Sequence, residues 1–232
     1  KQGRADAVAM ARYLEFYGGA ADKVHGETIP FANGYTALTL REPHGVTGHI
    51  IPWNYLMQVL GRSVGGALTM GNAVVLKPAE EACLTAIAFA RIAEEAGLPA
   101  GALNVVPGLG EEAGAALTAH PGVNHISFTG SVPVGRLIQK AAAENIVPVT
   151  LELGGKSPQV VLADCDDLDF AAQTIAAGIF GNSGQVCNAG SRLIVEDKIK
   201  DKLLEKIMAH ATALTPGDPL SPETKLGSIV TE

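Results

Sequence analysis

Hydrophobic positions along this chain follow two periods in turn. Short apolar runs such as Ala73-Val74-Val75-Leu76 are typical of buried strands. Longer segments with apolar residues three or four positions apart are typical of amphipathic helices. The runs predict strands at 45–51, 73–78, 103–107, 123–128 and 147–153. The longer segments predict helices at 59–70, 82–96, 110–119 and 134–143.

After Pro158 the same alternation begins a second time. It predicts strands at 158–162 and 191–195, and helices at 168–180 and 198–213. Strands and helices that alternate through short loops favour a doubly wound parallel sheet, in which ligands bind at the carboxyl ends of the strands. The predicted fold class is therefore α/β: a Rossmann-like parallel sheet followed by the start of a second α/β domain.

The N-terminal part has a different pattern. Residues 2–20 predict an amphipathic helix that ends at Gly18-Gly19. Residues 25–43 contain Asn33-Gly34 between extended stretches, which is a strong signal for a β-hairpin. The sequence therefore predicts a β-hairpin between the first helix and the first strand of the sheet.

Composition narrows the class of protein. Of the 232 residues 47% are hydrophobic, but only 5% are aromatic, so aliphatic side chains must fill the core. A net charge of −7 without a basic stripe argues against a nucleic-acid partner. No apolar run reaches the ~18 residues of a membrane span. Three cysteines are too few for a disulfide framework, which favours a reducing compartment such as the cytoplasm.

Cys187 is the candidate nucleophile. It lies in a loop of small residues, Gly184-Gln185-Val186-Cys187-Asn188-Ala189-Gly190, where a backbone can approach a substrate closely. A buried cysteine that packs as a small hydrophobe is the more common case. Cys83, inside a helical pattern, and Cys165, beside three aspartates, have no comparable setting.

Two polar residues follow predicted strands and could assist a thiol. Glu152 ends an otherwise apolar strand before Gly154-Gly155, and a carboxylate there is suited to taking a proton from water. Asn54, in Ile51-Pro52-Trp53-Asn54, has an amide that could hold an oxyanion at the carboxyl edge of the sheet. An exposed carboxylate and an ordinary turn asparagine are the alternatives.

Two further segments suit a nucleotide. Lys77 and Glu80 follow a strand and could hold ribose hydroxyls, although a solvated charge pair is also plausible. In Gly130-Ser131-Val132-Pro133-Val134-Gly135 a tight turn at Gly130 leads into a helix whose free N–H groups suit a pyrophosphate. The alternative is an ordinary capped helix. The six histidines show no ligand spacing, so no metal site is predicted.

Taken together, these segments resemble the aldehyde dehydrogenase superfamily, in its NAD(P)-dependent, non-acylating branch. The resemblance covers essentially the whole chain. It implies Cys187 as nucleophile, Glu152 as general base, and Asn54 with the Cys187 N–H as oxyanion hole. It also implies a set of cofactor residues: Ile51, Trp53, Lys77, Glu80, Gly110, Phe128, Gly130, Ser131, Gly135 and Leu153. The Glu80 carboxylate would repel a 2′-phosphate, which favours NAD over NADP.

The resemblance also implies a domain organisation. Residues 1–24 and 44–155 correspond to part of the NAD-binding domain, 25–43 to an oligomerisation hairpin, and 156–232 to the N-terminal part of the catalytic domain. A homodimer or homotetramer acting on a small aldehyde is the expected assembly. Because the chain begins within a helical pattern and ends without a closing element, we expect an internal fragment. The family's Glu-x-Phe-Gly-Pro segment is absent, and Asn188 is unusual after the cysteine.

Two alternatives stay open. An acylating dehydrogenase would pass the thioester to coenzyme A, but those relatives generally lack the glutamate that stands here at Glu152. A non-catalytic nucleotide-binding fragment would keep the fold alone. The sequence does not name the aldehyde.

Overall fold

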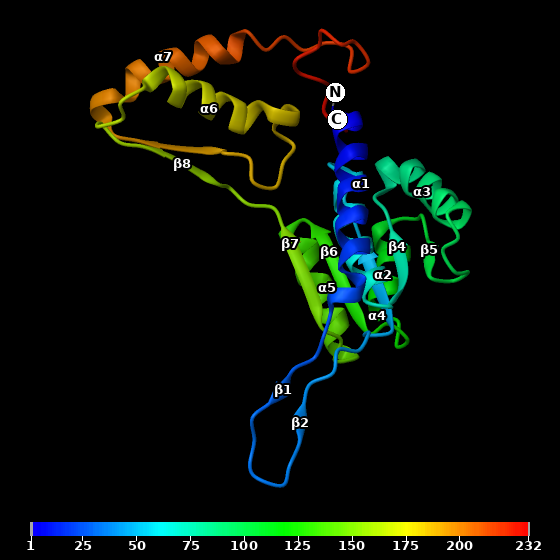
Figure 1. The fold of residues 1–232 in the computed structure, drawn as a ribbon. Helices are drawn as coiled ribbons and strands as arrows, with labels where there is room; N and C mark the ends of the chain where they lie inside the picture. The colour runs from blue at the N-terminus through cyan, green and yellow to red at the C-terminus, as the bar shows by residue number, and fades with distance from the viewer. Residues whose placement is uncertain (1, 232) are drawn as a thin grey trace. The chain divides into compact units, whose positions relative to one another are not determined.

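The computed structural model describes residues 2–231, which form two compact units (Figure 1). The first unit is Gln2–Glu152 and the second is Leu153–Glu232. The boundary falls between Glu152 and Leu153, at the end of a strand. In the part of the chain that the structure describes, no helix is both long and apolar enough to cross a membrane.

A five-stranded parallel sheet forms the centre of the first unit. Its strands, in the order β5-β4-β3-β6-β7, are Leu103–Val105, Ala73–Lys77, Val46–Ile50, His125–Gly130 and Val149–Leu153. The chain builds outward from β3 through β4 to β5, and then returns to add β6 and β7 on the other side. The carboxyl ends of β3 and β6 therefore meet where the strand order reverses, the usual place for a ligand in such sheets.

Helices cover both faces of this sheet, as the predicted doubly wound fold requires. Along β4, Val74 and Leu76 pack with helices α2 (Leu56–Thr69) and α3 (Cys83–Glu95) in the main hydrophobic core. The alternate residues of β4 face the opposite side, because successive side chains of a strand point to opposite faces. There α4 (Ala115–Ala119) and α5 (Val132–Glu144) pack against each other. The fold class predicted from periodicity is confirmed.

Helix α1 (Gln2–Ala20) packs along α2. Buried Asp6 accepts hydrogen bonds from Gln2 and from Gln58 of α2. The predicted helix over residues 2–20 is confirmed, and the two glycines form part of its last turn. Gly18 and Gly19 lie inside the helix, which passes at Ala21 into a short 3₁₀ turn, Ala21–Lys23. Glycine is only mildly unfavourable in a helix, so packing overrides it.

The hairpin pairs strands β1 (Thr28–Ile29) and β2 (Ala37–Leu38) antiparallel. Its turn is closed by a hydrogen bond from the Tyr35 N–H to the Ala32 carbonyl, with Gly34 at φ 86°. The Asn-Gly prediction is confirmed. Most of the extended stretch around it stays outside regular strands.

The second unit is smaller. Strands β8 (Pro158–Val161) and β9 (Arg192–Val195) form a parallel pair, and α6 (Leu168–Phe180) packs on α7 (Asp197–Thr212). Its core is the cluster Val161, Ala172, Ile175 and Leu203.

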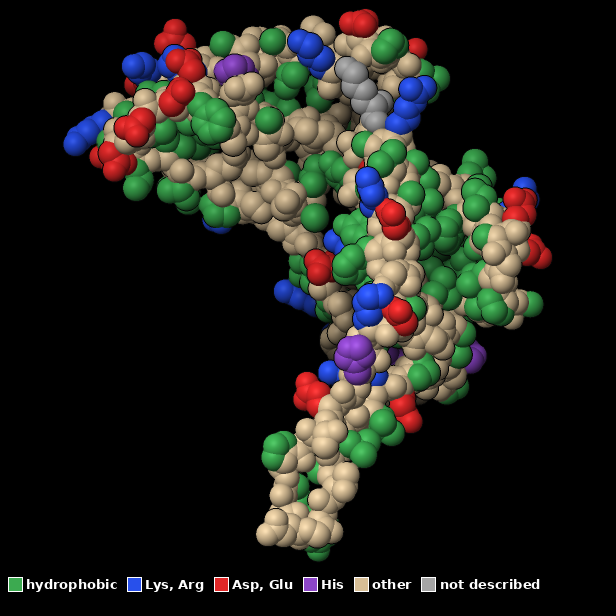
Figure 2. Space-filling model, viewed as in Figure 1, with side chains coloured by type: hydrophobic (Ala, Val, Ile, Leu, Met, Phe, Trp, Pro, Cys, Tyr) green, Lys and Arg blue, Asp and Glu red, His purple; other side chains and the backbone are tan. Residues whose placement is uncertain are grey.

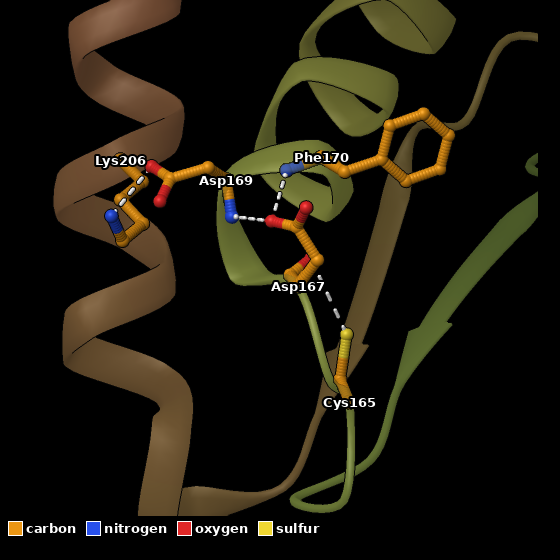
Figure 3. Close-up of polar contacts among 5 residues, drawn as sticks. All are labelled: Cys165, Asp167, Asp169, Phe170 and Lys206. Atoms are coloured by element: carbon orange, nitrogen blue, oxygen red, sulfur yellow. Dashed lines mark hydrogen bonds and ion pairs between the residues drawn. The ribbon is translucent and has the colours of Figure 1, made fainter.

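Polar contacts hold the start of α6 (Figure 3). Asp167 caps the helix by accepting from the N–H groups of Asp169 and Phe170. Asp169 pairs with Lys206 of α7, and the hydrogen bond from that lysine lowers the pKa of the carboxyl. The Cys165 thiol donates to the Asp167 carbonyl at 3.6 Å, so it belongs to this helix start.

Candidate functional site

The turn after β3 holds Asn54. Ile51 is buried, and its N–H donates to the Lys77 carbonyl at 3.1 Å. Trp53 and Asn54 are half-buried. Tyr55, the N-cap residue directly before α2, has left-handed backbone angles of φ 49° and ψ 34°. Such a conformation costs ~1–3 kcal/mol and is common at functional sites. The sharp turn places the Asn54 amide directly after the strand at the switch point of the sheet.

Lys77 and Glu80 meet at the end of β4. The Lys77 ammonium donates to Glu80 Oε1 at 3.0 Å. The lysine side chain is 3% exposed and the glutamate 37%, so the pair shows only its carboxylate to solvent. Partial burial acts to raise the pKa of Glu80. Hydrogen bonds from its own N–H, from Lys77 and from the Gly110 N–H, with the lysine charge, lower this pKa overall. Glu80 is therefore a stable anion with lone pairs available to hydroxyl donors.

Gly110 connects this pair to an apolar pocket. It opens a single wide turn, Gly110–Gly114, ahead of α4, in which the Gly114 N–H donates to the Leu109 carbonyl five residues back. Such π-type turns are frequent at functional sites. Thr118, which is buried, donates to the Gly114 carbonyl at 2.7 Å.

The pocket lies between α4 and α5 and has a volume of about 630 Å³. Its lining is almost wholly apolar and includes Ile50, Ala115, Val134, Leu137, Ile138 and Ala141. The sequence prediction missed these residues. Their signal is the spacing of Val134, Leu137, Ile138 and Ala141 on α5, an apolar stripe of which Val134 and Leu137 stay 42% and 65% exposed.

The strand-to-helix segment after β6 differs in detail from its prediction. Gly130 is the last residue of β6 and does not have a positive φ, so no tight turn explains it. Instead, a Cβ there would lie 2.4 Å from the ring of buried Phe128. Ser131 is the N-cap of α5 and accepts from the Val134 N–H at 3.4 Å. Gly135 is buried within that helix. The segment is thus a capped helix start in front of an aromatic ring.

Glu152 and Leu153 end β7, the edge strand of the sheet. Burial alternates along this strand, and Glu152 is on its exposed side while Leu153 is half-buried. The prediction of a carboxylate at a strand terminus is met. The surrounding strand is less buried than the apolar run suggested, because an edge strand has a neighbour on one side only.

Cys187 lies in the loop between α6 and β9 and is an exposed free thiol. Cys83 and Cys165 are half-buried. Three consecutive residues at the start of this loop, Asn182, Ser183 and Gly184, have φ values of 50°, 58° and 77°. Each non-glycine residue in this left-handed region costs ~1–3 kcal/mol and persists only where its surroundings hold it.

Hydrogen bonds hold the loop on both sides of the thiol. Gln185 Nε2 donates to the Asn182 carbonyl, and Gln185 Oε1 accepts from the Val230 N–H at 2.9 Å. The Ser183 hydroxyl donates to the Gly227 carbonyl at 2.8 Å. The Ala189 N–H donates to the Val186 carbonyl, which closes a turn with Cys187 at its first central position.

The structure brings some predicted residues together within each unit. Lys77, Glu80 and Gly110 form one cluster, and Phe128 packs on Gly130. Gly155, which follows β7, lies next to the loop that carries Cys187, since a Cβ on Gly155 would lie 4.0 Å from the Cys187 carbonyl oxygen. Cys187 belongs to the second unit, whereas Asn54 and Glu152 belong to the first.

Comparison with known proteins identifies the family of this chain. The family model described as "Aldehyde dehydrogenase family" matches residues 1–232. The chain belongs to the aldehyde dehydrogenase family. It is 47% identical, over 97% of its length, to hydroxyisobutyraldehyde dehydrogenase of Mycolicibacterium austroafricanum, of which it covers 44%. It is 46% identical, over 98%, to the NADP/NAD-dependent aldehyde dehydrogenase PuuC of Escherichia coli, of which it covers 46%.

Solved structures of the family agree with the fold. A crystal structure of indole-3-acetaldehyde dehydrogenase in complex with NAD⁺ superimposes with a TM-score of 0.93 at 44% identity. That match covers 96% of this chain and 45% of the solved one. The chain thus spans about half the length of the family members that it matches. The family resemblance seen in the sequence motifs is confirmed.

Proposed function

We propose that the full-length protein oxidises an aldehyde to a carboxylic acid with NAD⁺ as hydride acceptor, through a thioester on Cys187. The observation that carries this proposal is the setting of Cys187. It is an exposed thiol on a loop of strained backbone, in a chain of the aldehyde dehydrogenase family. Reactive cysteines lie at such exposed positions, whereas buried cysteines are inert.

The residues of this chain would act in two stages. In the first, the Cys187 thiolate forms a C–S bond with the aldehyde carbon, and the carbonyl electron pair moves to oxygen. The Asn54 amide and the Cys187 N–H would donate to that oxyanion. When the carbonyl re-forms, the former aldehyde hydrogen leaves with its two electrons and a thioester remains on Cys187. Bound NAD⁺ supplies the acceptor for this hydride.

In the second stage Glu152 would take a proton from water. The hydroxide attacks the thioester carbon, the C–S bond breaks, and the carboxylic acid and the thiolate are released. An exposed carboxylate at the end of β7 is accessible to water, which this role requires. The presence of Glu152 favours hydrolysis over transfer to coenzyme A.

The residues of the first unit suit the adenosine half of NAD. The apolar pocket between α4 and α5 fits a flat base, and Gly110 joins it to the Glu80 carboxylate, which fits ribose hydroxyls. The N-terminus of α5 would face the pyrophosphate. Because Glu80 is an anion, we propose a preference for NAD over NADP. The relative PuuC is named for use of both cofactors, and the preference proposed here rests on Glu80 of this chain.

The direct test is an assay of the full-length protein with short aliphatic and aromatic aldehydes. NADH formation is followed at its absorbance band, with and without coenzyme A. We expect NADH formation without coenzyme A, and a carboxylic acid as product. A strict requirement for coenzyme A would establish the acylating alternative. NAD binding without turnover of any aldehyde would support the nucleotide-binding alternative.

We also propose that the hairpin pairs with a second copy of the chain. Its large hydrophobic side chains are exposed, among them Phe31 at 70%, Tyr35 at 73% and Leu40 at 72%. Figure 2 shows hydrophobic side chains at the surface of this hairpin. Exposed apolar surface of this kind marks interaction sites. Sedimentation of the full-length Tyr35→Ser, Leu40→Ser variant should show smaller particles than the parent. An unchanged oligomer would refute this assignment.

A further inference from the structure

Gln159 connects the two elements on either side of the thiol loop. It lies on β8, and its side-chain amide is half-buried. Its Nε2 donates to the Gly190 carbonyl at 2.9 Å and to the Ile175 carbonyl at 3.4 Å. Ile175 belongs to α6, which leads into the loop, and Gly190 belongs to the segment that leaves it. One amide group therefore bridges the incoming helix and the outgoing chain.

The space around this amide is closely filled. A Cβ on Gly190 would lie 2.3 Å from both Cδ and Nε2 of Gln159. A Cβ on Gly178 of α6 would lie 3.1 Å from Oε1. The Gly190 N–H donates to the Gly178 carbonyl at 3.1 Å. Both backbone groups of Gly190 are thus bonded, one to α6 and one to Gln159, three residues after Cys187.

The loop needs such an anchor. On the incoming side, Asn182 and Ser183 have left-handed backbone angles that persist only where neighbouring groups hold them. On the outgoing side, the segment from Asn188 to Ser191 belongs to no helix or strand. The bonds at Gly190 are the contacts that tie this outgoing segment to α6 and β8.

We propose that Gln159 is a positioning residue for the reaction of Cys187. It holds Gly190 and thereby sets the place of the thiol and of its backbone N–H. This inference rests on the proposed nucleophilic role of Cys187. A displacement of ~1 Å in a reacting group can lower a rate by ~10²-fold, so a single anchoring bond is sufficient to matter.

The test uses Gln159→Met in the full-length protein, which keeps the length of the side chain and removes the donor. Asn104→Leu is the matched control, because Asn104 Nδ2 also donates to two backbone carbonyls, those of Gly101 at 2.8 Å and Val74 at 3.3 Å. Asn104 lies on β5, in the other unit. Both variants lose one amide bridge, but only one of them touches the thiol loop.

We expect Gln159→Met to lower the pre-steady-state burst rate of NADH by ~10²-fold. Its KM for NAD⁺ should stay unchanged, because the residues proposed to hold the adenosine half of NAD lie in the first unit. Asn104→Leu should keep the burst rate. Hydrogen exchange of residues 181–192 should quicken in Gln159→Met and not in Asn104→Leu. Since exchange needs no turnover, it tests the anchor even if the proposed reaction is wrong.

A second pair of variants covers poor folding of Gln159→Met. Gly190→Ala should displace the glutamine amide and lower the burst rate in the same way. In Gly190→Ala with Gln159→Ala the clash is gone, so the second substitution should cost little more than the first. An unchanged burst rate and exchange rate in Gln159→Met, equal effects of Asn104→Leu, or fully additive losses in the double variant would each overturn the proposal.

Discussion

The two units hold their functional residues by different means. In the first unit, helices cover both faces of the sheet, and the residues after β3 and β4 stand directly on buried strands. In the second unit, Val161 is 8% exposed beneath the helices, while Val160 and Ile194 are 60% and 52% exposed. Parallel strands are usually buried on both faces. Among the residues that the structure describes, the β8–β9 pair therefore has one covered face.

In the second unit, hydrogen bonds from side chains hold the residues around Cys187. Around Cys187 the loop is held by side-chain amides and hydroxyls, from Asn182, Ser183, Gln185 and Gln159. Around Lys77 and Glu80 the backbone is held by sheet hydrogen bonds and by the main core. The cofactor side is therefore expected to tolerate loss of a single polar contact better than the thiol side does.

The largest effect should come from the second unit. Cys187→Ala in the full-length protein removes the only group proposed to form a covalent bond with the substrate. Aldehyde oxidation should fall by more than ~10⁴-fold, because losing a covalent nucleophile removes the whole covalent route. Cys165→Ala is the control, since that thiol belongs to the α6 helix start, and its activity should stay near that of the parent. Turnover by the Cys187→Ala protein would end the assignment.

Glu152→Gln tests the role proposed for Glu152 of the first unit, which is to take a proton from water in the second stage of the reaction. It keeps the size of the side chain and removes the base, so steady-state turnover should fall by ~10²–10⁴-fold. The NADH burst should survive, because it precedes attack by water. Rapid-mixing absorbance separates the two rates. A parallel loss of both would mean that Glu152 activates the thiol, and a loss of neither would leave it a structural carboxylate.

Two fully buried leucines compare the cores directly. Leu60 lies in the main core of the first unit, Leu203 lies in the small core of the second, and both are 0% exposed. Substitution by Ala should lower the free energy of unfolding by ~2–5 kcal/mol. Leu60→Ala should be at the upper end, because a densely surrounded cavity collapses less. Urea denaturation measures the free energy of unfolding of each variant. Hydrogen exchange shows which segments unfold locally.

With Leu203→Ala, faster exchange should be confined to residues 153–231. Equal acceleration in β3 and β4 would show that the two units unfold together, which would remove the contrast drawn between them.

The buried histidine His49 makes the stability of the first unit depend on pH. It is buried in the first unit and hydrogen-bonds with Ser63 and Thr47. Burial, with a smaller contribution from the charge of His125, lowers its pKa from 6.5 to about 4. The unfolded chain therefore takes up this proton at a higher pH than the folded one. The effect of His49 on the free energy of unfolding is therefore absent above pH 6.5. As the pH drops from 6.5 toward 4, protonation of this histidine in the unfolded chain lowers that free energy by roughly 3 kcal/mol in all.

Denaturation of the full-length protein across this pH range measures the slope. His49→Gln should flatten it, whereas His25→Gln, at an exposed histidine of the hairpin, should not. An unchanged slope in His49→Gln would assign the acid sensitivity to other groups.

The smallest effect concerns the choice of cofactor. Two unit charges ~4 Å apart in water repel by ~1 kcal/mol, which is roughly fivefold in binding. Glu80→Gln should therefore raise kcat/KM with NADP about fivefold relative to NAD. Steady-state kinetics with both cofactors gives the ratio. Equal use of NAD and NADP by the unmodified enzyme would refute the repulsion argument.

Periodicity and local motifs by themselves determined most of the architecture. The strand and helix order was predictable because buried parallel strands are short apolar runs and their covering helices repeat every three or four residues. Cys187, Asn54 and the Lys77–Glu80 pair were also visible, because each stands in a short segment directly after a predicted element.

Only the tertiary structure decided how these groups are held. That Gly130 makes room for the Phe128 ring, rather than a turn, depends on where that ring packs. That Glu152 lies on an edge strand depends on the strand order. The amide bridge of Gln159 joins residues 16 and 31 positions apart, and no local pattern encodes such a contact. The order of helices and strands follows from local sequence, whereas strand order, burial at an edge and hydrogen bonds between distant segments exist only once the chain has folded.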